Sequence, residues 1–254
     1  MHRFYLPPEQ CAEKRLILDG AEAHHAREVL RLERASTVVV LDGAGGEYTA
    51  EVVEETRHQV RLVCTETRRA PPPECRVTLL QAVPRGKLFE TIIQKATELG
   101  VARIVPVISE RTTPRFDSDP AGKTEKWRRV AIEAIKQCGC PWLPLVETPV
   151  TPAEYLARRE PVELGLVASL RPGRRHARVY FQDFQQREKR RPGSVSVWIG
   201  PEGDLTPEEV RAIQDAGCRP IDLGPLVLRS DTAAIYSLAI INHELRSPTG
   251  AAAS

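Results

Sequence analysis

The sequence predicts an α/β protein in two parts, a small β-rich N-terminal domain and a larger domain built on a parallel sheet. Short apolar runs with strand character and a single helical segment make up the first 70 residues. A proline run at 71–73 follows, and its fixed φ angles favour an extended linker. From residue 76 onward strands and helices alternate, which is typical of a parallel sheet with helices on both faces. We therefore expect domains at 1–70 and 74–247 and a disordered tail at 248–254.

The composition supports a folded globular protein and excludes several classes. Hydrophobic residues make up 41% of the 254 residues, and 36 Lys and Arg nearly balance 34 Asp and Glu, so general disorder is excluded. The most apolar stretch, 233–241, is about half the ~20 residues of a membrane-spanning helix. Residues 1–4 lack the apolar run of a signal peptide, so we expect a cytoplasmic protein without membrane contact. Six scattered cysteines form no CxxC pair, so we expect no metal site.

The N-terminal elements suggest a small β-barrel with one helix. The helix should begin after Asp19 as N-cap and direct Val29 and Leu30 inward. Strands at 38–41 and 48–53 should form a hairpin around a glycine-rich loop that starts at Asp42. An alternating run at 60–64 should be the next strand of the barrel.

The helices of the larger domain are predicted from the spacing of apolar residues and from residues typical of helix ends. A helix at 87–99 should stop at Gly100 and bury a stripe that includes Leu88 and Ile92. Thr151 and Thr206 each begin a capping box with proline at the first helical position. Two more helices are expected at 123–137 and 231–245, and strands at 77–80, 103–108, 164–167 and 195–199.

Two segments in which a loop leaves a strand carry Gly-Pro pairs, at 197–204 and at 221–229. In parallel α/β sheets, ligands bind beyond the carboxyl ends of the strands. Glycines there would let a flat ligand approach backbone groups able to read an adenine edge. A plain strand-to-helix turn explains one such loop equally well, but two loops about 24 residues apart favour a ligand site. The sequence contains no dinucleotide fingerprint, P-loop or nucleophile elbow.

Several blocks of the chain together resemble one family. Those blocks are Ile199-Gly-Pro-Glu-Gly203, Leu223-Gly-Pro-Leu-Val-Leu-Arg-Ser-Asp-Thr-Ala233, Lys95-Ala-Thr-Glu-Leu-Gly-Val101 with Arg111, Lys136-Gln-Cys-Gly139, Arg3-Phe4 and His24 to Arg31. They resemble the signature of SPOUT-class RNA methyltransferases and, more narrowly, of the small-subunit ribosomal RNA uracil-N3 methyltransferase family. The chain departs from the family pattern at Cys140 and Leu226, where arginine is frequent, at Asp204, where glycine is usual, and at Asp231, where glutamate is usual.

The resemblance implies a fold, a cofactor and an assembly. It implies a PUA-like β-barrel followed by a SPOUT domain with a C-terminal trefoil knot, and a homodimer in which each subunit completes its partner's pocket. It also implies S-adenosylmethionine as cofactor and small-subunit ribosomal RNA or the assembled small subunit as substrate. The cofactor-binding residues implied are Val167, Ala168, Ile199, Gly200, Pro201, Glu202, Gly203, Leu223, Gly224, Leu226, Leu228, Arg229, Thr232 and Ala233.

The chemistry of uracil N3 suggests candidate catalytic residues. The N3 proton is weakly acidic, and its loss leaves negative charge on O2 and O4, which a fixed arginine could stabilise. Arg229 is the first candidate for that role, and Glu202 is a second residue that could orient it or accept a proton. The alternative is that Arg229 only caps a helix or pairs with Asp231.

Candidate RNA-binding residues come from the resemblance and from the distribution of charge. Between residues 85 and 136 there are 11 Lys and Arg against 7 Asp and Glu, whereas the first 72 residues have 10 against 12. Basic segments supply the salt-dependent part of RNA affinity, although a solvated helix face has the same composition. The candidates are Arg3, His24, His25, Arg27, Arg31, Arg111, Lys123, Lys126, Arg128 and Arg129.

Two other functions stay open at this point. One is a SPOUT enzyme that methylates a ribose 2′-oxygen of tRNA or rRNA. The other is a non-catalytic RNA-binding factor in ribosome assembly. The position of the methylated atom tests the first alternative, and methyl incorporation tests the second.

Overall fold

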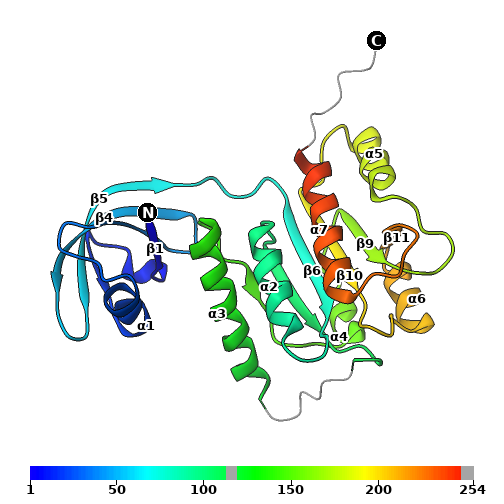
Figure 1. Cartoon of the computed structure of the whole chain (residues 1–254). Coiled ribbons are helices and arrows are strands. Elements are labelled where there is room, and N and C mark those ends of the chain that lie inside the picture. The colour runs from blue at the N-terminus through cyan, green and yellow to red at the C-terminus, as the bar shows by residue number, and fades with distance from the viewer. Residues whose placement is uncertain (113–118, 247–254) are drawn as a thin grey trace. The chain divides into compact units, whose positions relative to one another are not determined.

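The computed structural model describes residues 1–112 and 119–246 (Figure 1). The chain divides into two compact units, one of Met1–Pro73 with Ala131–Leu143 and one of Glu74–Val130 with Pro144–Ser254. The tail expected at 248–254 and the domain end expected at 247 lie outside the described residues. Within the two described ranges, no helix is both long and apolar enough to cross a membrane.

The first unit is built on a five-stranded sheet in the order β1-β3-β4-β5-β2. Strand β1 is parallel to β3, and the other neighbours are antiparallel. The expected hairpin of β3 and β4 is confirmed, and Asp42 shapes its turn because its Oδ1 accepts the N–H groups of Ala44 and Gly46, both at 2.7 Å. The strands are β1 (His2–Tyr5), β2 (Arg15–Leu18), β3 (Thr37–Leu41), β4 (Gly46–Glu55) and β5 (Val60–Arg69).

The helix of the first unit differs from its predicted form. Helix α1 (Gly20–His24) starts after Asp19, whose side chain makes no capping hydrogen bond. It continues as a π-helix, η2 (His25–Val29). The wider π turn changes which residues face inward, so Ala23 and Ala26 are buried and Val29 is 63% exposed. The prediction that Val29 faces the core is therefore wrong, while Leu30 packs against the core.

The end of helix α3 (Pro120–Cys138) belongs to the first unit. The ammonium of Lys136, only 7% exposed, forms ion pairs with Glu22 at 2.8 Å and Glu133 at 2.9 Å. Burial raises the pKa of the Glu22 carboxyl. The guanidinium of Arg3 donates to the carbonyls of Lys136 and Gln137 at the C-terminal end of α3. A cation is stabilised there by the negative end of the helix dipole. These contacts attach the helix end to β1 and α1.

The second unit is built on a six-stranded, all-parallel sheet in the order β11-β9-β10-β6-β7-β8. Helices α2, α7 and α5 pack in one layer, and α4 and α6 contact each other in another (Figure 1). The strands are β6 (Arg76–Ala82), β7 (Arg103–Val107), β8 (Leu145–Val146), β9 (Leu164–Ala168), β10 (Ser194–Ile199) and β11 (Arg219–Ile221). The helices, besides α3, are α2 (Leu88–Glu98), α4 (Pro152–Ala157), α5 (Ala177–Glu188), α6 (Pro207–Asp215) and α7 (Ser230–Arg246).

In the second unit, the sequence predicts the ends of the helices more accurately than it predicts which residues of each helix are buried. Both capping boxes are confirmed. The hydroxyl of each threonine accepts the backbone N–H of the glutamate three residues on, and the side chain of that glutamate accepts the backbone N–H of the threonine. The pairs are Thr151 with Glu154 and Thr206 with Glu209. In α2 the inward stripe includes Phe89, whose ring packs edge-on against Trp127 with centroids 4.6 Å apart. Leu88, predicted to be buried, is 37% exposed, because the buried stripe runs through Phe89, Ile92, Ile93, Ala96 and Thr97 and Leu88 lies beside it.

The ion pair of Glu163 and Arg190 should make a contribution to the free energy of unfolding that is lost at acidic pH. The two nitrogens of Arg190 donate to Glu163 at 2.7 and 2.8 Å, and with the Gly193 N–H they lower the pKa of this carboxyl from 4.5 to about 2. A lowered folded-state pKa means that the contribution is present above pH 4.5 and is lost as the pH falls toward 2. We expect Glu163→Gln to remove that part of the pH dependence. Denaturant unfolding at about pH 7, 4.5 and 3 measures it, and an unchanged pH profile would contradict the expectation.

Candidate cofactor pocket

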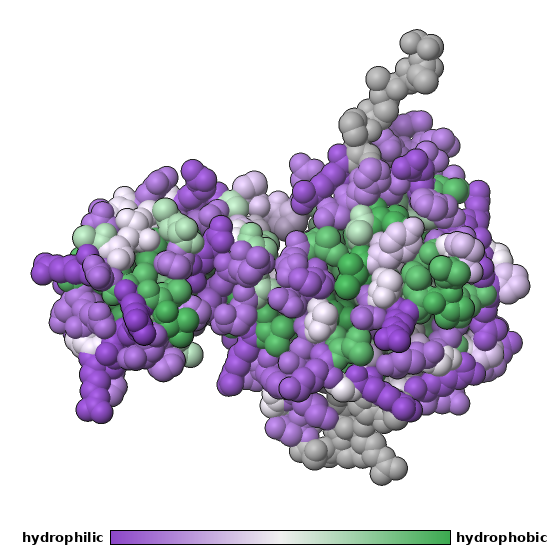
Figure 2. Space-filling model, in the orientation of Figure 1, coloured by the Kyte–Doolittle hydropathy of each residue, from purple (hydrophilic) through white to green (hydrophobic). Residues whose placement is uncertain are grey.

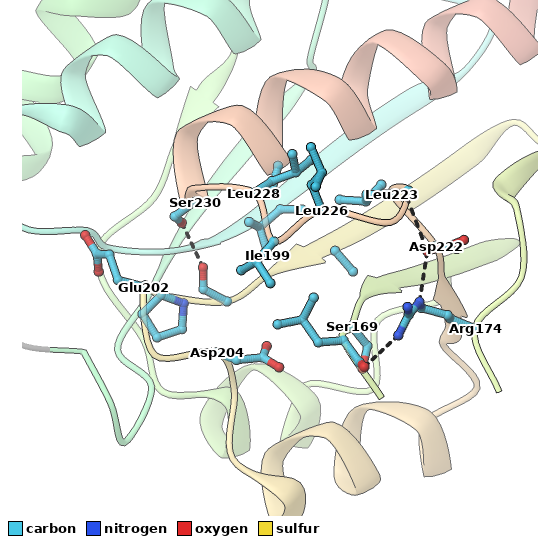
Figure 3. A pocket seen from close by; sticks show the side chains of 17 residues that line it. Ser169, Arg174, Ile199, Glu202, Asp204, Asp222, Leu223, Leu226, Leu228 and Ser230 are labelled. Atoms are coloured by element: carbon cyan, nitrogen blue, oxygen red, sulfur yellow. Dashed lines mark hydrogen bonds and ion pairs between the residues drawn. The ribbon is translucent and has the colours of Figure 1, made fainter. Parts of the chain in front are cut away.

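A pocket opens at the carboxyl ends of β9, β10 and β11 in the second unit (Figure 3). Its walls come from three segments, the residues after Ala168, the loop that begins at Ile199 and the loop between β11 and α7. The space among them is about 590 Å³ including its open mouth, which suits a ligand of nucleoside size. This is the edge of a parallel sheet at which ligands bind.

The first residue of α7 fixes two of these segments together. The hydroxyl of Ser230 donates to the carbonyl of Gly200 at 2.8 Å and accepts from the amide of Gln81, also at 2.8 Å. Ser230 and Gln81 are both buried. The start of α7 is therefore bonded at the ends of β6 and β10 in the middle of the sheet (Figure 3).

The loop after β10 turns tightly at two residues. Asp204 adopts φ 60, in the left-handed region that favours glycine, and its Oδ1 accepts the N–H of Leu205 at 2.8 Å. A Cβ on Gly200 would lie 3.0 Å from the backbone nitrogen of Leu205, so the close approach of the two backbone segments favours glycine there.

The pocket carries more negative than positive charge. Arg174 pairs with Asp222 at 2.9 Å, and its other donor reaches the carbonyl of Leu170 at 2.6 Å (Figure 3). Glu202 and Asp204 also line the pocket, and neither forms an ion pair with a residue in the described ranges. A pocket with two uncompensated carboxylates favours a cationic ligand.

The structure brings most of the cofactor-binding candidates together in this pocket. Those that line it are Ala168, Ile199, Gly200, Pro201, Glu202, Leu223, Gly224, Leu226, Leu228 and Ala233. The candidates outside the lining are Val167, Gly203, Arg229 and Thr232. Val167 is fully buried in the core below the strand end.

Sequence reasoning missed a whole wall of the pocket. Ser169, Leu170 and Arg174 follow β9, and Asp222 lies beside them because it pairs with Arg174. The segment after Ala168 has no glycine-rich pattern at the strand end, although Arg174 and Asp222 are both polar residues close to carboxyl ends of strands. That position was the available signal. Val227 and Ser230, also missed, lie within or directly after the predicted loop.

The two catalytic candidates lie on different loops. Glu202 lines the pocket mouth, and its Oε1 accepts the N–H of Arg85 at 3.3 Å. Arg229 is exposed just before α7, and its carbonyl accepts the N–H of Ala233 at 2.8 Å. Its side chain makes no ion pair with Asp231 or with any other residue that the structure describes.

The RNA-binding candidates of the second unit are exposed or engaged with neighbours. Arg111 donates to the carbonyl of Gly203 at 2.6 Å and so supports the loop after β10. Lys126 pairs with Glu90 at 2.6 Å. Arg129 lies 3.5 Å from Glu125 one turn earlier, and Lys123 and Arg128 also interact with neighbouring residues. The four candidates other than Arg111 lie on α3.

The candidates of the first unit cluster near α1 and η2. Arg27 pairs with Glu55 at 2.7 Å and also donates to the carbonyl of Arg57. His25 packs edge-on against Phe4, with centroids 6.2 Å apart. His24 and Arg31 are exposed, and Arg31 adopts φ 50. Arg3 is occupied at the end of α3 as described above.

Comparison with known proteins gives the class. Residues 71–242 match the family model of an RNA methyltransferase domain, and residues 18–63 match that of an RNA methyltransferase PUA domain. The fold and the pocket therefore define an RNA methyltransferase with a PUA domain.

Individual relatives narrow this class to one family. The ribosomal RNA small subunit methyltransferase E of Synechocystis is 32% identical over 97% of this chain and 78% of its own length, and that of Aquifex aeolicus is 32% identical over 95% and 99%. A methyltransferase of Legionella pneumophila, solved with bound SAM, is 30% identical with a TM-score of 0.85 and coverage of 95% of this chain and 96% of its own. The chain belongs to the ribosomal RNA small subunit methyltransferase E family.

Proposed function

We propose that this protein transfers a methyl group from S-adenosylmethionine to N3 of a specific uridine in small-subunit ribosomal RNA. The pocket at the carboxyl ends of β9, β10 and β11 carries this proposal, because it combines an apolar floor with uncompensated carboxylates. The family to which the chain belongs supports the RNA substrate. Ribosomal RNA as substrate implies a cytoplasmic protein.

The residues of the pocket fit S-adenosylmethionine. Glu202 and Asp204 suit a ligand that carries a sulfonium and an ammonium group, and Arg174 offers a cation for its carboxylate. The backbone at Gly224 is open to a flat base, because a Cβ there would meet no atom within 4 Å, and Ile199 offers apolar contact. Two relatives solved with this cofactor, from Legionella pneumophila and Neisseria gonorrhoeae, support the proposal. When bound, the cofactor supplies an electrophilic methyl group.

The chain's own residues must then position the uracil and stabilise its anion. We propose that Arg229 stabilises the negative charge that develops on O2 and O4 of the uracil. Its exposed guanidinium has no hydrogen-bond or ion-pair partner among the described side chains, and Arg229 lies at the end of a pocket loop. We assign Glu202, which lines the pocket, as the second catalytic residue, which would orient that guanidinium or accept the N3 proton. We keep Val167, Gly203 and Thr232 as cofactor-binding candidates on the same segments of the chain, Val167 from within the core and the other two from exposed positions.

The proposed fold includes the trefoil knot of the SPOUT class. After β11 at the edge of the sheet, the chain returns to the middle, where Ser230 bonds to Gln81 and Gly200. The loop between β11 and α7 thus passes over the ends of β9 and β10. That path supports the proposed knot, in which the C-terminal part of the chain is threaded through a loop that precedes it.

We further propose that two copies pair through the loop between β11 and α7. Leu226 and Val227 in this loop are 74% and 77% exposed, and Figure 2 shows an apolar patch there. Exposed apolar patches mark interaction sites. The fold of a single copy already buries the α7 residues Ala234, Leu238 and Ile241, so the loop and the exposed Tyr236 are the surface left for a partner.

Charge placed in this loop should separate the copies. We expect Leu226→Asp with Val227→Asp to raise the dimer dissociation constant at least tenfold and to lower methyl transfer in parallel, because burying a carboxylate without a partner is costly. Sedimentation velocity at micromolar concentrations measures the assembly. A wild-type protein that is monomeric there and fully active would contradict the proposal that the dimer completes the site.

RNA contact is proposed for basic residues of both units. Arg3, His24, His25, Arg27 and Arg31 belong to the first unit, and Arg111, Lys123, Lys126, Arg128 and Arg129 to the second. Their surface positions support a role in backbone contact.

Transfer of a labelled methyl group tests the function. Small-subunit ribosomal RNA and assembled small subunits from cells that lack the gene serve as substrates, and the same material from cells that carry the gene is the control. We expect incorporation from S-adenosylmethionine only into material from the deletion strain, because the target is already methylated in the control. Absence of incorporation into both forms would favour a non-catalytic RNA-binding factor.

A further inference from the structure

A second hollow, rich in arginine, lies on the second unit between α5 and the starting ends of β9 and β11. It is lined by the start of β9, one face of α5 and the start of β11, and its space is about 790 Å³ including its mouth. Arg175, Arg187 and Arg219 line it together with Tyr180 and Phe184.

The arginines of this hollow are incompletely neutralised. Arg175 lies 3.9 Å from Asp183, and both side chains are more than half exposed, so the pair is loose. Arg219 forms no hydrogen bond or ion pair through its side chain with a described residue. The other carboxylate of the hollow, Glu163, is already held by Arg190.

Two of these guanidinium groups lie over aromatic rings. Arg175 lies 5.9 Å from the ring centre of Tyr180, and Arg187 lies 5.6 Å from that of Phe184. Stacking restrains a guanidinium without using its N–H donors. Arg187 donates one of them, its Nε–H, to the exposed carboxylate of Glu188 at 2.7 Å, so the N–H groups of its two terminal nitrogens remain available for an anion such as phosphate. The surrounding chain is basic as well, since residues 171–191 contain 8 Lys and Arg against 2 Asp and Glu.

The hollow adjoins the cofactor pocket through consecutive residues. Arg174 lines the pocket, and Arg175 lines the hollow. The backbone of Arg175 is fixed beside β11, because its N–H donates to Pro220 at 3.2 Å and its carbonyl accepts from Asp222 at 3.0 Å. An RNA strand with one nucleotide at the pocket could therefore reach the hollow at Arg175.

We propose that the hollow lined by Arg175, Arg187 and Arg219 binds the phosphodiester backbone of the RNA substrate next to the methylated nucleotide. This inference rests on the proposed function. It adds an RNA-binding surface on α5 and β11, separate from the basic residues of α3 and of the first unit. Because these contacts go to phosphate, they set affinity and register and leave the chemical step unchanged.

Neutralising the three arginines tests the surface. The full-length Arg175→Gln, Arg187→Gln, Arg219→Gln variant is compared with a control of equal charge change, Arg159→Gln, Arg178→Gln, Arg211→Gln, whose residues are exposed outside the hollow. The probe is small-subunit ribosomal RNA transcribed in vitro, with affinity measured by fluorescence anisotropy at several KCl concentrations. Calorimetry with S-adenosylmethionine verifies that each variant keeps its pocket.

We expect the hollow variant to bind RNA on the order of tenfold or more weakly and to show a flatter salt dependence, by about 0.7–0.9 in log-log slope for each phosphate group that is no longer bound. Its KM for RNA should rise while kcat at saturating RNA stays unchanged, and the control should bind within about threefold of wild type. Normal RNA affinity in the hollow variant, or an equal loss in the control, would overturn the proposal. The proposal would also be overturned if the wild type bound polyglutamate in preference to RNA and the hollow variant lost that binding. The partner of the hollow would then be an acidic protein.

The outcome is separable from that of the proposed function. A wild type that methylates the RNA while the hollow variant binds it normally would overturn the surface alone. A wild type that binds RNA through these arginines but transfers no methyl group would overturn the proposed function and leave the surface standing.

Discussion

Arg229→Ala is expected to lower kcat by on the order of 10²- to 10³-fold at neutral pH, which is about 3 kcal/mol of transition-state stabilisation. The reason is the charge that spreads over O2 and O4 when uracil loses its N3 proton. Arg229 is exposed, and its side chain makes no hydrogen bond or ion pair with described residues, so its removal should leave the fold and RNA affinity nearly unchanged. The defect should ease at higher pH, where more of the uracil is already ionised. Methyl transfer measured from about pH 7 to 10 checks this.

The matched control for this variant is Arg211→Ala, an exposed arginine on α6 outside the pocket. Its activity should equal that of the wild type across the same pH range. If Arg229→Ala loses the same factor at neutral and alkaline pH with cofactor binding intact, Arg229 is a helix-end residue and the role assigned to it is wrong.

Gly224→Val is expected to abolish binding of S-adenosylmethionine while the protein stays folded. Gly224 has φ +104, and a Cβ there would meet no atom within 4 Å, so the added methyl groups would enter open space at the pocket wall. The backbone strain costs about 1–3 kcal/mol, within the stability of a typical domain. Calorimetric titration with the cofactor measures the loss.

Gly100→Val provides the control for strain. Gly100 also has a positive φ of +77 and open space around its Cβ, but it follows α2 and does not line the pocket. It should lose comparable stability and bind the cofactor normally. Near-normal cofactor affinity in Gly224→Val would contradict the pocket assignment. Gly200 is less suited to this test, because a Cβ there lies 3.0 Å from the Leu205 nitrogen and would displace the loop.

Local signals in the sequence predicted those features that depend on a few neighbouring residues. Thr151 and Thr206 carry the full capping-box pattern, and both boxes form. The Gly-Pro loops marked two walls of the pocket because glycine is favoured there by close backbone approach or positive φ. Asp42 likewise shapes the turn of the predicted hairpin through its own side chain.

Features that depend on long-range packing were not predictable in this way. The π-helical turn at His25–Val29 has no separate sequence signature, so the inward face of that helix was misplaced. Lys136 looks like an ordinary surface residue of an amphipathic helix, yet it pairs with Glu22, 114 residues away along the chain. Arg174 reaches the pocket only because its segment folds back beside Asp222.

Identification of the methylated atom tests the proposed chemistry most directly. Small-subunit ribosomal RNA from the deletion strain is treated with the protein and S-adenosylmethionine, digested to nucleosides and analysed by mass spectrometry. We expect one new nucleoside, a uridine with the methyl group on the base at N3, and no change in ribose methylation. A methyl group on the ribose 2′-oxygen, or on any base atom other than uracil N3, would contradict the proposed function.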